Sequence, residues 1–185
     1  MNNPVWYVLH DSDTYRSLSN PSVHPRVFLD LAERFRDGKV IGDAWDPPYL
    51  YLDEETGEDS KPMGSFPGFS GFFVIGKTAL EVLYPIIEST IIEILPLPCS
   101  VEGLSVLNIK KVDCIDHSRS RFRYFSSGKI MRVERFAFVQ QNLEGKHIFR
   151  LEEESFAKVF ADDVFKTSVE ENELHGLSFF ALDQA

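Results

Sequence analysis

Aspartate and histidine, residue types able to do acid–base chemistry, come together in this sequence in the string DCIDH. An aspartate beside a histidine at the end of a strand can orient the imidazole as a general acid or base. The sequence around Asp113, Asp116 and His117 supplies no catalytic partner. We therefore interpret the string as a polar turn that ends a strand. The alternative is a small enzyme of unknown reaction, assisted by Arg121 or Arg123.

The other reactive residue types are scattered. His10 with Asp11 and Asp13 resembles a metal site only superficially, because short acidic runs are common in loops. Cys99 and Cys114 are too few for a disulfide scaffold and stand in surroundings typical of packing residues. Phosphate-binding glycine loops, nucleophile elbows and zinc-protease motifs do not occur in the sequence. We therefore expect no cofactor, no metal ion and no enzymatic activity.

The overall charge restricts the classes of partner. The 185 residues include 29 acidic and 19 basic side chains, for a net charge of −10. This balance argues against a nucleic-acid partner, because phosphate backbones require a basic footprint. The sequence has neither a basic leader before an apolar run nor an apolar window near the roughly 20 residues of a membrane span. We expect a cytoplasmic protein with no membrane partner.

Apolar patterning predicts the elements that position these residues. Residues 5–9 predict a strand that is paired on both sides, because both of its faces are apolar. An amphipathic helix starts at Pro25 and ends before Gly38, which stands where a C-terminal cap belongs. Its apolar face consists of Phe28, Leu31, Ala32 and Phe35.

Strands and one further helix are predicted in the middle of the chain. Thr78 and Glu81 have the spacing of a capping box that opens the helix, and Pro85 should kink or split it. The residues expected on its inner face are Leu80, Leu83 and Ile87. The expected strands cover residues 49–52, 72–75, 91–97 and 104–115.

Residues 126–151 are predicted to form a strand, a polar turn and a second strand that organise the rest of the fold. The apolar phase slips at Glu134 or Arg135, which predicts a bulge or sharp bend. A helix over residues 164–172, capped by Asp162, should follow and fold back on this pair. A last strand is expected over residues 177–182.

These elements predict an α+β fold with a mixed, largely antiparallel sheet and a few packed helices. Strands outnumber helices, and short connections join neighbouring strands. Residues 1–70 are expected to form an acidic N-terminal lobe, and residues 71–185 the α+β core. We expect the two to share one compact unit.

Charged and aromatic residues suggest two surfaces. An acidic run is followed by the glycine-, proline- and aromatic-rich string SKPMGSFPGFSG, a loop type that often carries binding function. A surface hairpin tip with a linker is the plainer interpretation. A basic excess lies further along the chain and is interpreted as a solvated strand face, with pairing to the acidic half as a variant. Its members are Arg119, Arg121, Arg123, Lys129, Arg132, Arg135, Lys146 and Arg150.

The sequence resembles the bacterial immunity protein 11 family over about residues 70–183. The strings that carry the resemblance are GKTALEVLYPIIESTIIEILPLPC, VLNIKKVDCID, SSGKIMRVERFAFVQQNLEGKHIFRLEE and FADDVFKTSVEENELHGLSFFALD. Residues 128–151, which end in KHIFRL, are the most specific part. The resemblance implies a cytoplasmic antidote that neutralises a polymorphic toxin by binding it. It supplies no catalytic residues and no toxin contacts.

We therefore expect a cognate toxin domain as the partner, with the acidic run imitating an anionic substrate. The expected acidic contacts are Asp53, Glu54, Glu55, Glu58 and Asp59. The expected aromatic anchors are Trp45, Tyr49, Tyr51, Phe66 and Phe69. A different possibility is a self-associating scaffold protein, a homodimer in which the basic face of one copy docks on the acidic half of the other.

Overall fold

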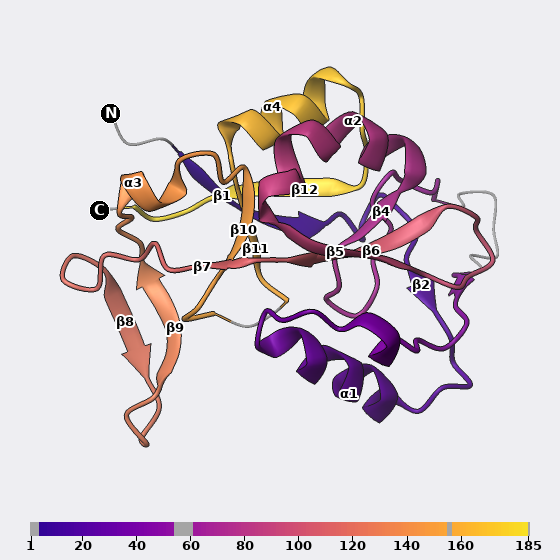
Figure 1. Cartoon of the computed structure of the whole chain (residues 1–185), viewed down its shortest axis with the longest axis horizontal. Coiled ribbons are helices and arrows are strands. Elements are labelled where there is room, and N and C mark those ends of the chain that lie inside the picture. Colours follow the sequence, from indigo (N-terminus) through magenta and orange to yellow (C-terminus); the bar gives the residue numbers. More distant parts are fainter. Residues whose placement is uncertain (1–3, 54–60, 155–156, 185) are drawn as a thin grey trace.

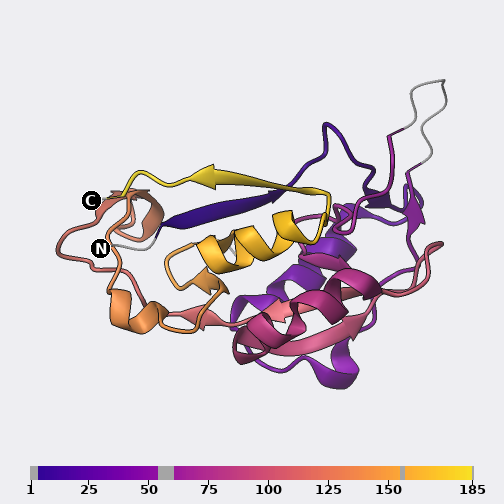
Figure 2. The same ribbon diagram turned by 90° about the horizontal axis from the view of Figure 1, so that it is seen from above.

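The structure is a computed structural model that describes residues 4–53, 61–154 and 157–184. Its fold is α+β, with largely antiparallel sheets and few helices, as the sequence predicts. The helices are α1 (Pro25–Arg36), α2 (Lys77–Ile87), α3 (Gln140–Leu143) and α4 (Asp163–Glu171). Figures 1 and 2 show their arrangement around the strands.

A five-stranded sheet joins the two ends of the chain. Its strands, in order across the sheet, are β12 (Leu177–Ala181), β1 (Val5–His10), β11 (Val159–Asp162), β10 (Ile148–Leu151) and β7 (Lys111–Val112). All neighbours are antiparallel except β10 and β7. The prediction that the first strand is paired on both sides is confirmed, since β1 lies between β12 and β11.

A second sheet contains β4 (Val74–Gly76), β6 (Leu104–Ile109) and β5 (Ile91–Pro96), in that order. The prediction of one strand over residues 104–115 is wrong, because the chain leaves this sheet after Ile109. Lys110 donates its N–H to the carbonyl of Thr90 at 2.8 Å, and its own carbonyl accepts from the N–H of Arg150 at 3.0 Å. The segment therefore crosses from the three-stranded to the five-stranded sheet.

Two short ribbons complete the strands. One pairs β2 (Leu18–Ser19) with β3 (Tyr51–Leu52), and the other pairs β8 (Arg121–Tyr124) with β9 (Ile130–Arg135). The expected pairing within residues 126–151 is wrong, because β9 pairs with β8 and the short α3 separates it from β10.

The predicted bulge is confirmed at Glu134. Arg121 lies opposite Arg135, whereas the next residue, Phe122, lies opposite Val133, so Glu134 is the extra residue. The bulge lets the apolar side chains before and after it fall on different parities of the strand.

Helices α1, α2 and α4 lie where the sequence predicts helices, whereas α3 lies in the segment predicted as a polar turn. Asp162 caps α4 through its carboxylate, which accepts from the N–H of Phe165 at 3.0 Å. Gly76, and not Thr78, is the N-cap of α2, and no side chain caps it, so the predicted capping box is wrong. Pro85 lies inside α2, and the helix continues through it to Ile87 without splitting.

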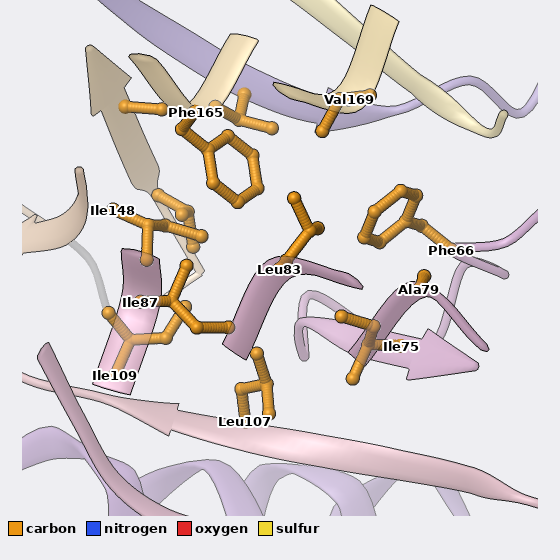
Figure 3. Packing of buried hydrophobic residues seen from close by; sticks show 13 residues of the cluster. Phe66, Ile75, Ala79, Leu83, Ile87, Leu107, Ile109, Ile148, Phe165 and Val169 are labelled. Carbon is orange, nitrogen blue, oxygen red and sulfur yellow. The ribbon is translucent and has the colours of Figure 1, made fainter. Parts of the chain in front are cut away.

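Strand β6 separates two hydrophobic clusters because its side chains alternate between its faces. Leu107 and Ile109 pack under α2 and α4, whereas Leu104 and Val106 pack over α1. Figure 3 shows the first cluster, in which Leu83 and Phe165 point toward each other between the two helices and the strands. In Figure 1, α2 and α4 accordingly lie on one side of the strands and α1 on the other.

A third cluster covers the opposite face of the five-stranded sheet. Phe149 and Phe160 stack with their ring centroids 6.1 Å apart, and Phe136 lies 5.9 Å from Phe160. The buried thiol of Cys114 joins them. Burial, with the charges of nearby carboxylates, raises the pKa of Cys114 to about 12, so the thiol is a packing group.

Candidate partner-binding surface

Two tyrosines form an exposed aromatic pair beside β3. Tyr49 is 48% exposed and Tyr51 is 52% exposed, and their ring centroids are 5.2 Å apart in an edge-to-face arrangement. The β2–β3 ribbon holds them through the register of Ser19 opposite Tyr51, and the side chain of Asn20 donates to the carbonyl of Tyr49 at 2.8 Å. Tyrosine pairs held in this way offer apolar area and hydroxyls to a partner at little cost in side-chain entropy.

Asp53 directly follows this pair and is fixed at both its side chain and its backbone. Its carboxylate accepts from the hydroxyl of Ser19, and its carbonyl accepts from Nε of Arg16 at 2.7 Å. The other predicted acidic contacts lie outside the described residues. They are Glu54, Glu55, Glu58 and Asp59.

Trp45 lines a groove together with Asp46 and Pro47, which precede Tyr49 in the chain. Its indole N–H donates to the carbonyl of Pro96 at 2.7 Å, and its ring meets that of Phe35 edge-on at 5.7 Å. The groove has a volume of about 660 Å³, and Leu80 and Leu97 contribute to its lining. Trp45 is half-buried, so one side of its ring supports the core while another faces the groove.

The other two predicted anchors lie in the core. Phe66 is 1% exposed and Phe69 is 3% exposed. Phe66 packs with the α2 and α4 cluster, and Phe69 with the α1 cluster. Side chains this buried have no surface to offer a partner. Of the predicted site residues that the structure describes, Tyr49, Tyr51 and Asp53 lie together on and beside β3, and Trp45 lies on the groove.

The loop that carries Phe66 and Phe69 lines a pocket of about 300 Å³ with His10 at its polar end. Nδ1 of His10 lies 2.8 Å from the carbonyl of Phe66 and 3.1 Å from that of Gly176, so it must carry the proton. Nε2 lies 3.3 Å from the hydroxyl of Ser17, and in the neutral imidazole it accepts that hydrogen bond. His10 thereby ties three distant segments of the chain together.

Gly68 closes over this histidine. A Cβ atom at position 68 would lie 2.8 Å from both Nε2 of His10 and the hydroxyl of Ser17, and it would also press on the imidazole carbon Cδ2. Such close backbone approach leaves room for glycine alone. The packing indicates that the His10 and Ser17 pair joins chain segments, a role that the sequence alone did not reveal.

The DCIDH string leads into a turn that begins at His117, and its acidic and basic groups contact different partners. The carboxylate of Asp116 accepts from the hydroxyl and the N–H of Ser118, and these hydrogen bonds lower the pKa of Asp116. Nε2 of His117 lies 2.7 Å from the carboxylate of Glu153, and its ring stacks on Phe122 at 4.9 Å. Within the part of the chain that the structure describes, Asp113, Asp116 and His117 share no hydrogen bond.

The described residues contain neither a metal-binding cluster nor a helix able to span a membrane. Across residues 4–53, 61–154 and 157–184, no three histidine, cysteine or acidic residues gather where they could hold a metal ion. The helices of this part of the chain are also too short or too polar to cross a bilayer.

Comparison with known families finds a match to part of the chain. Residues 106–183 match the model of the immunity protein family Imm11. The predicted resemblance is confirmed. The Imm11 region begins within β6 and extends past β12, so it includes the β8–β9 ribbon, whereas Tyr49, Tyr51 and Asp53 lie outside it. No curated protein matches the chain.

The Imm11 region carries a second exposed surface, which the sequence indicated only as a solvated strand face. We call residues 119–135, which contain β8, β9 and their connecting turn, the β8–β9 arm. Most of the predicted basic residues are exposed on it. Arg150, by contrast, is 3% exposed and belongs to the interior, so its assignment to the solvated face is wrong.

Proposed function

We propose that this protein is a non-enzymatic immunity protein that binds one cognate toxin domain in the cytoplasm and neutralises it by covering it. The match of residues 106–183 to the Imm11 immunity family carries this proposal. Immunity by occlusion requires an exposed binding surface and no reactive centre. The separate partners of Asp116 and His117 are consistent with that requirement.

We infer that the toxin docks on the surface formed by Tyr49, Tyr51, Asp53 and the groove beside Trp45. Aromatic side chains that are held in place supply much of the binding energy at protein interfaces, since they bury a large area and lose little entropy. The acidic run that starts at Asp53 would speed association with a cationic toxin face. The two contributions should therefore be separable in kinetics.

The test uses the toxin domain that this proposal expects to be encoded beside this gene. We expect co-expression to restore growth of cells that make the toxin, and the purified pair to form a one-to-one complex in which an equimolar amount of this protein abolishes toxin activity. Protection that needs far less than one molecule per toxin would contradict the proposal, because it would indicate turnover.

Variants assign the surface. Replacing Tyr49 and Tyr51 with alanine should weaken binding by about 10- to 100-fold, mainly through faster dissociation, with little change in folding stability. Phe180→Ala provides the control, because Phe180 is 52% exposed on β12 and lies outside this surface. Unchanged dissociation in the tyrosine variant would remove the pair from the interface.

Neutralising the acidic run tests the electrostatic part separately. Its five carboxylates are those of Asp53, Glu54, Glu55, Glu58 and Asp59. Their replacement by asparagine or glutamine should slow association at least about tenfold at low salt and flatten its salt dependence. An association rate that stays the same would show that this run does not face the toxin.

A further inference from the structure

The β8–β9 arm is basic and apolar at once. Residues 119–135 contain six basic side chains and one acidic side chain. Tyr124 is 55% exposed and Phe125 is 51% exposed beside the turn of the arm, and Met131 on β9 is also exposed. In Figure 1 the arm projects from the body, and only its base contacts the rest of the fold.

The strands of the arm place like charges opposite each other. Arg123 pairs in register with Arg132, and Arg121 with Arg135. Opposed cations destabilise an antiparallel pair unless anions compensate them. Glu134 lies 3.3 Å from Arg121 and 3.4 Å from Arg132, and it is the single acidic residue in the arm. The arm therefore favours a partner that brings further carboxylates.

The contact of the arm with the C-terminal segment is long and exposed. Arg135 lies 3.7 Å from the exposed carboxylate of Asp183. A two-stranded ribbon is only marginally stable in water by itself. Buried Val133 and the stack of Phe122 on His117 hold the base of the arm, but they leave its end exposed. A docked partner would stabilise that end.

The outer face of α2 and α4 has the complementary character. The two helices pack side by side, as Figure 1 shows. Their outer face carries a few exposed apolar side chains. These apolar residues are Val82, Tyr84 and Val164. The exposed acidic residues on and directly after the helices are Glu81, Glu88, Asp163, Glu170, Glu171 and Glu173. Lys77 and Lys166 are the basic residues of these helices.

The arm of a given chain points away from its own helix face in Figure 1. We propose that the β8–β9 arm of one copy docks on the α2/α4 face of a second copy. Reciprocal docking closes a dimer, whereas arm-to-arm pairing is opposed by the arginines on both strands. Outside the arm the chain carries 28 acidic and 13 basic residues, and this net negative charge repels a polyphosphate. An acidic protein face is therefore the favoured occupant of the arm. This proposal does not depend on the toxin.

Sedimentation velocity of the full chain at 50 mM and 500 mM NaCl tests it. We expect a dimer at low salt, and a dimer dissociation constant that rises by on the order of tenfold at high salt, because exposed charges at an interface are screened. A chain that stays monomeric at low salt and high concentration would overturn the proposal.

Charge reversal on each side provides the decisive experiment. Arg123→Glu with Lys129→Glu on the arm, and Glu88→Lys with Glu171→Lys on the helix face, should each weaken self-association at least about tenfold. An equimolar mixture of the two variants should associate again, because each supplies the sign that the other has lost. Failure of the mixture to associate, with both variants folded by circular dichroism, would refute the pairing of these faces.

Two further variants complete the design. Arg26→Glu with Lys39→Glu changes the net charge by the same amount on and just after α1 and should leave the dimer unchanged. Tyr124→Ser with Phe125→Ser should weaken the dimer without altering charge. An unchanged dimer in this variant would contradict the proposal. If the arm variants still dimerise normally but lose binding to nucleic acid or to the toxin, the arm serves another partner.

Discussion

Nη2 of Arg150 donates a hydrogen bond to the side-chain carbonyl of Asn108 across 3.2 Å, and both side chains are buried. The same guanidinium donates from Nε to the carbonyl of Ile109 at 2.7 Å and from Nη1 to that of Phe35 at 3.3 Å. Asn108 in turn donates to the carboxylate of Glu93 at 3.3 Å. One cation thus links β10, the end of β6 and the end of α1.

Arg150→Met should lower the free energy of unfolding by about 3 kcal/mol, because it removes the guanidinium donors from the carbonyls of Ile109 and Phe35 and from the buried amide oxygen of Asn108. Burial lowers the pKa of Arg150 to about 10, so the residue remains charged at neutral pH and these donors are in place. Urea unfolding measures the loss. Arg123→Met, at an exposed arginine, provides the control, and a similar small change in both variants would mean that the buried network contributes little.

Cys114 should make the fold sensitive to alkaline pH. Because burial raises the pKa of the folded thiol to about 12, the folded state keeps its proton above pH 9, where the unfolded thiol ionises. Its contribution to stability is therefore complete below pH 9 and falls by about 1.4 kcal/mol per pH unit as the pH rises toward 12.

The comparison with Cys114→Ala isolates this thiol, since other groups titrate equally in both proteins. The difference in unfolding free energy between the two proteins, measured in urea at pH 8, 9.5 and 10.5, should shrink by that amount. A constant difference would show that the thiol ionises normally in the folded state.

Gly68→Ala should cost roughly 1–3 kcal/mol of stability, because the added methyl group would press on His10 and Ser17 and nearby strands would have to shift. Thermal unfolding gives the measurement. At Gly76 an added Cβ would meet its nearest atom at 3.4 Å, an ordinary contact, so Gly76→Ala should be the milder change. Equal effects at the two glycines would argue against the close approach at position 68.

Pro85→Ala should stabilise the protein by roughly 1–3 kcal/mol. Helix α2 continues through this exposed proline, which has no N–H to donate to the carbonyl one turn earlier. Alanine supplies that donor without disturbing the core side of the helix. Chemical denaturation provides the test, with Pro48→Ala as a proline outside any helix. A destabilised Pro85→Ala protein would mean that the proline shapes the helix for its packing.

Much of the fold could be predicted because local patterns and tertiary contacts agree. The first strand is apolar on both faces, and β1 indeed has neighbours on both sides. The phase slip near Glu134 marks a real bulge. The failures occur where long-range contacts decide the outcome. The local sequence does not indicate that the chain changes sheets after Ile109, because this crossing depends on hydrogen bonds of Lys110 with the distant residues Thr90 and Arg150.

The candidate surface was less predictable for a related reason. Phe66 and Phe69 occur in a loop sequence typical of binding, yet the loop folds inward and both rings join core clusters. Tyr49 and Tyr51 remain exposed because side chains alternate along an extended chain, and Leu50 between them is fully buried. Composition identifies candidate anchors, but only the path of the backbone decides which side of the protein they face.

The position of β1 has a consequence for synthesis in the cell. This strand is made long before its neighbours β11 and β12, which come from residues 159–181, so Val5 waits for Asp162 before it can pair. Long sequence separations of this kind delay folding until most of the chain has been made. A chain that stops before residue 159 therefore leaves β1 without either neighbour, and this sheet forms only once residues 159–181 have been made.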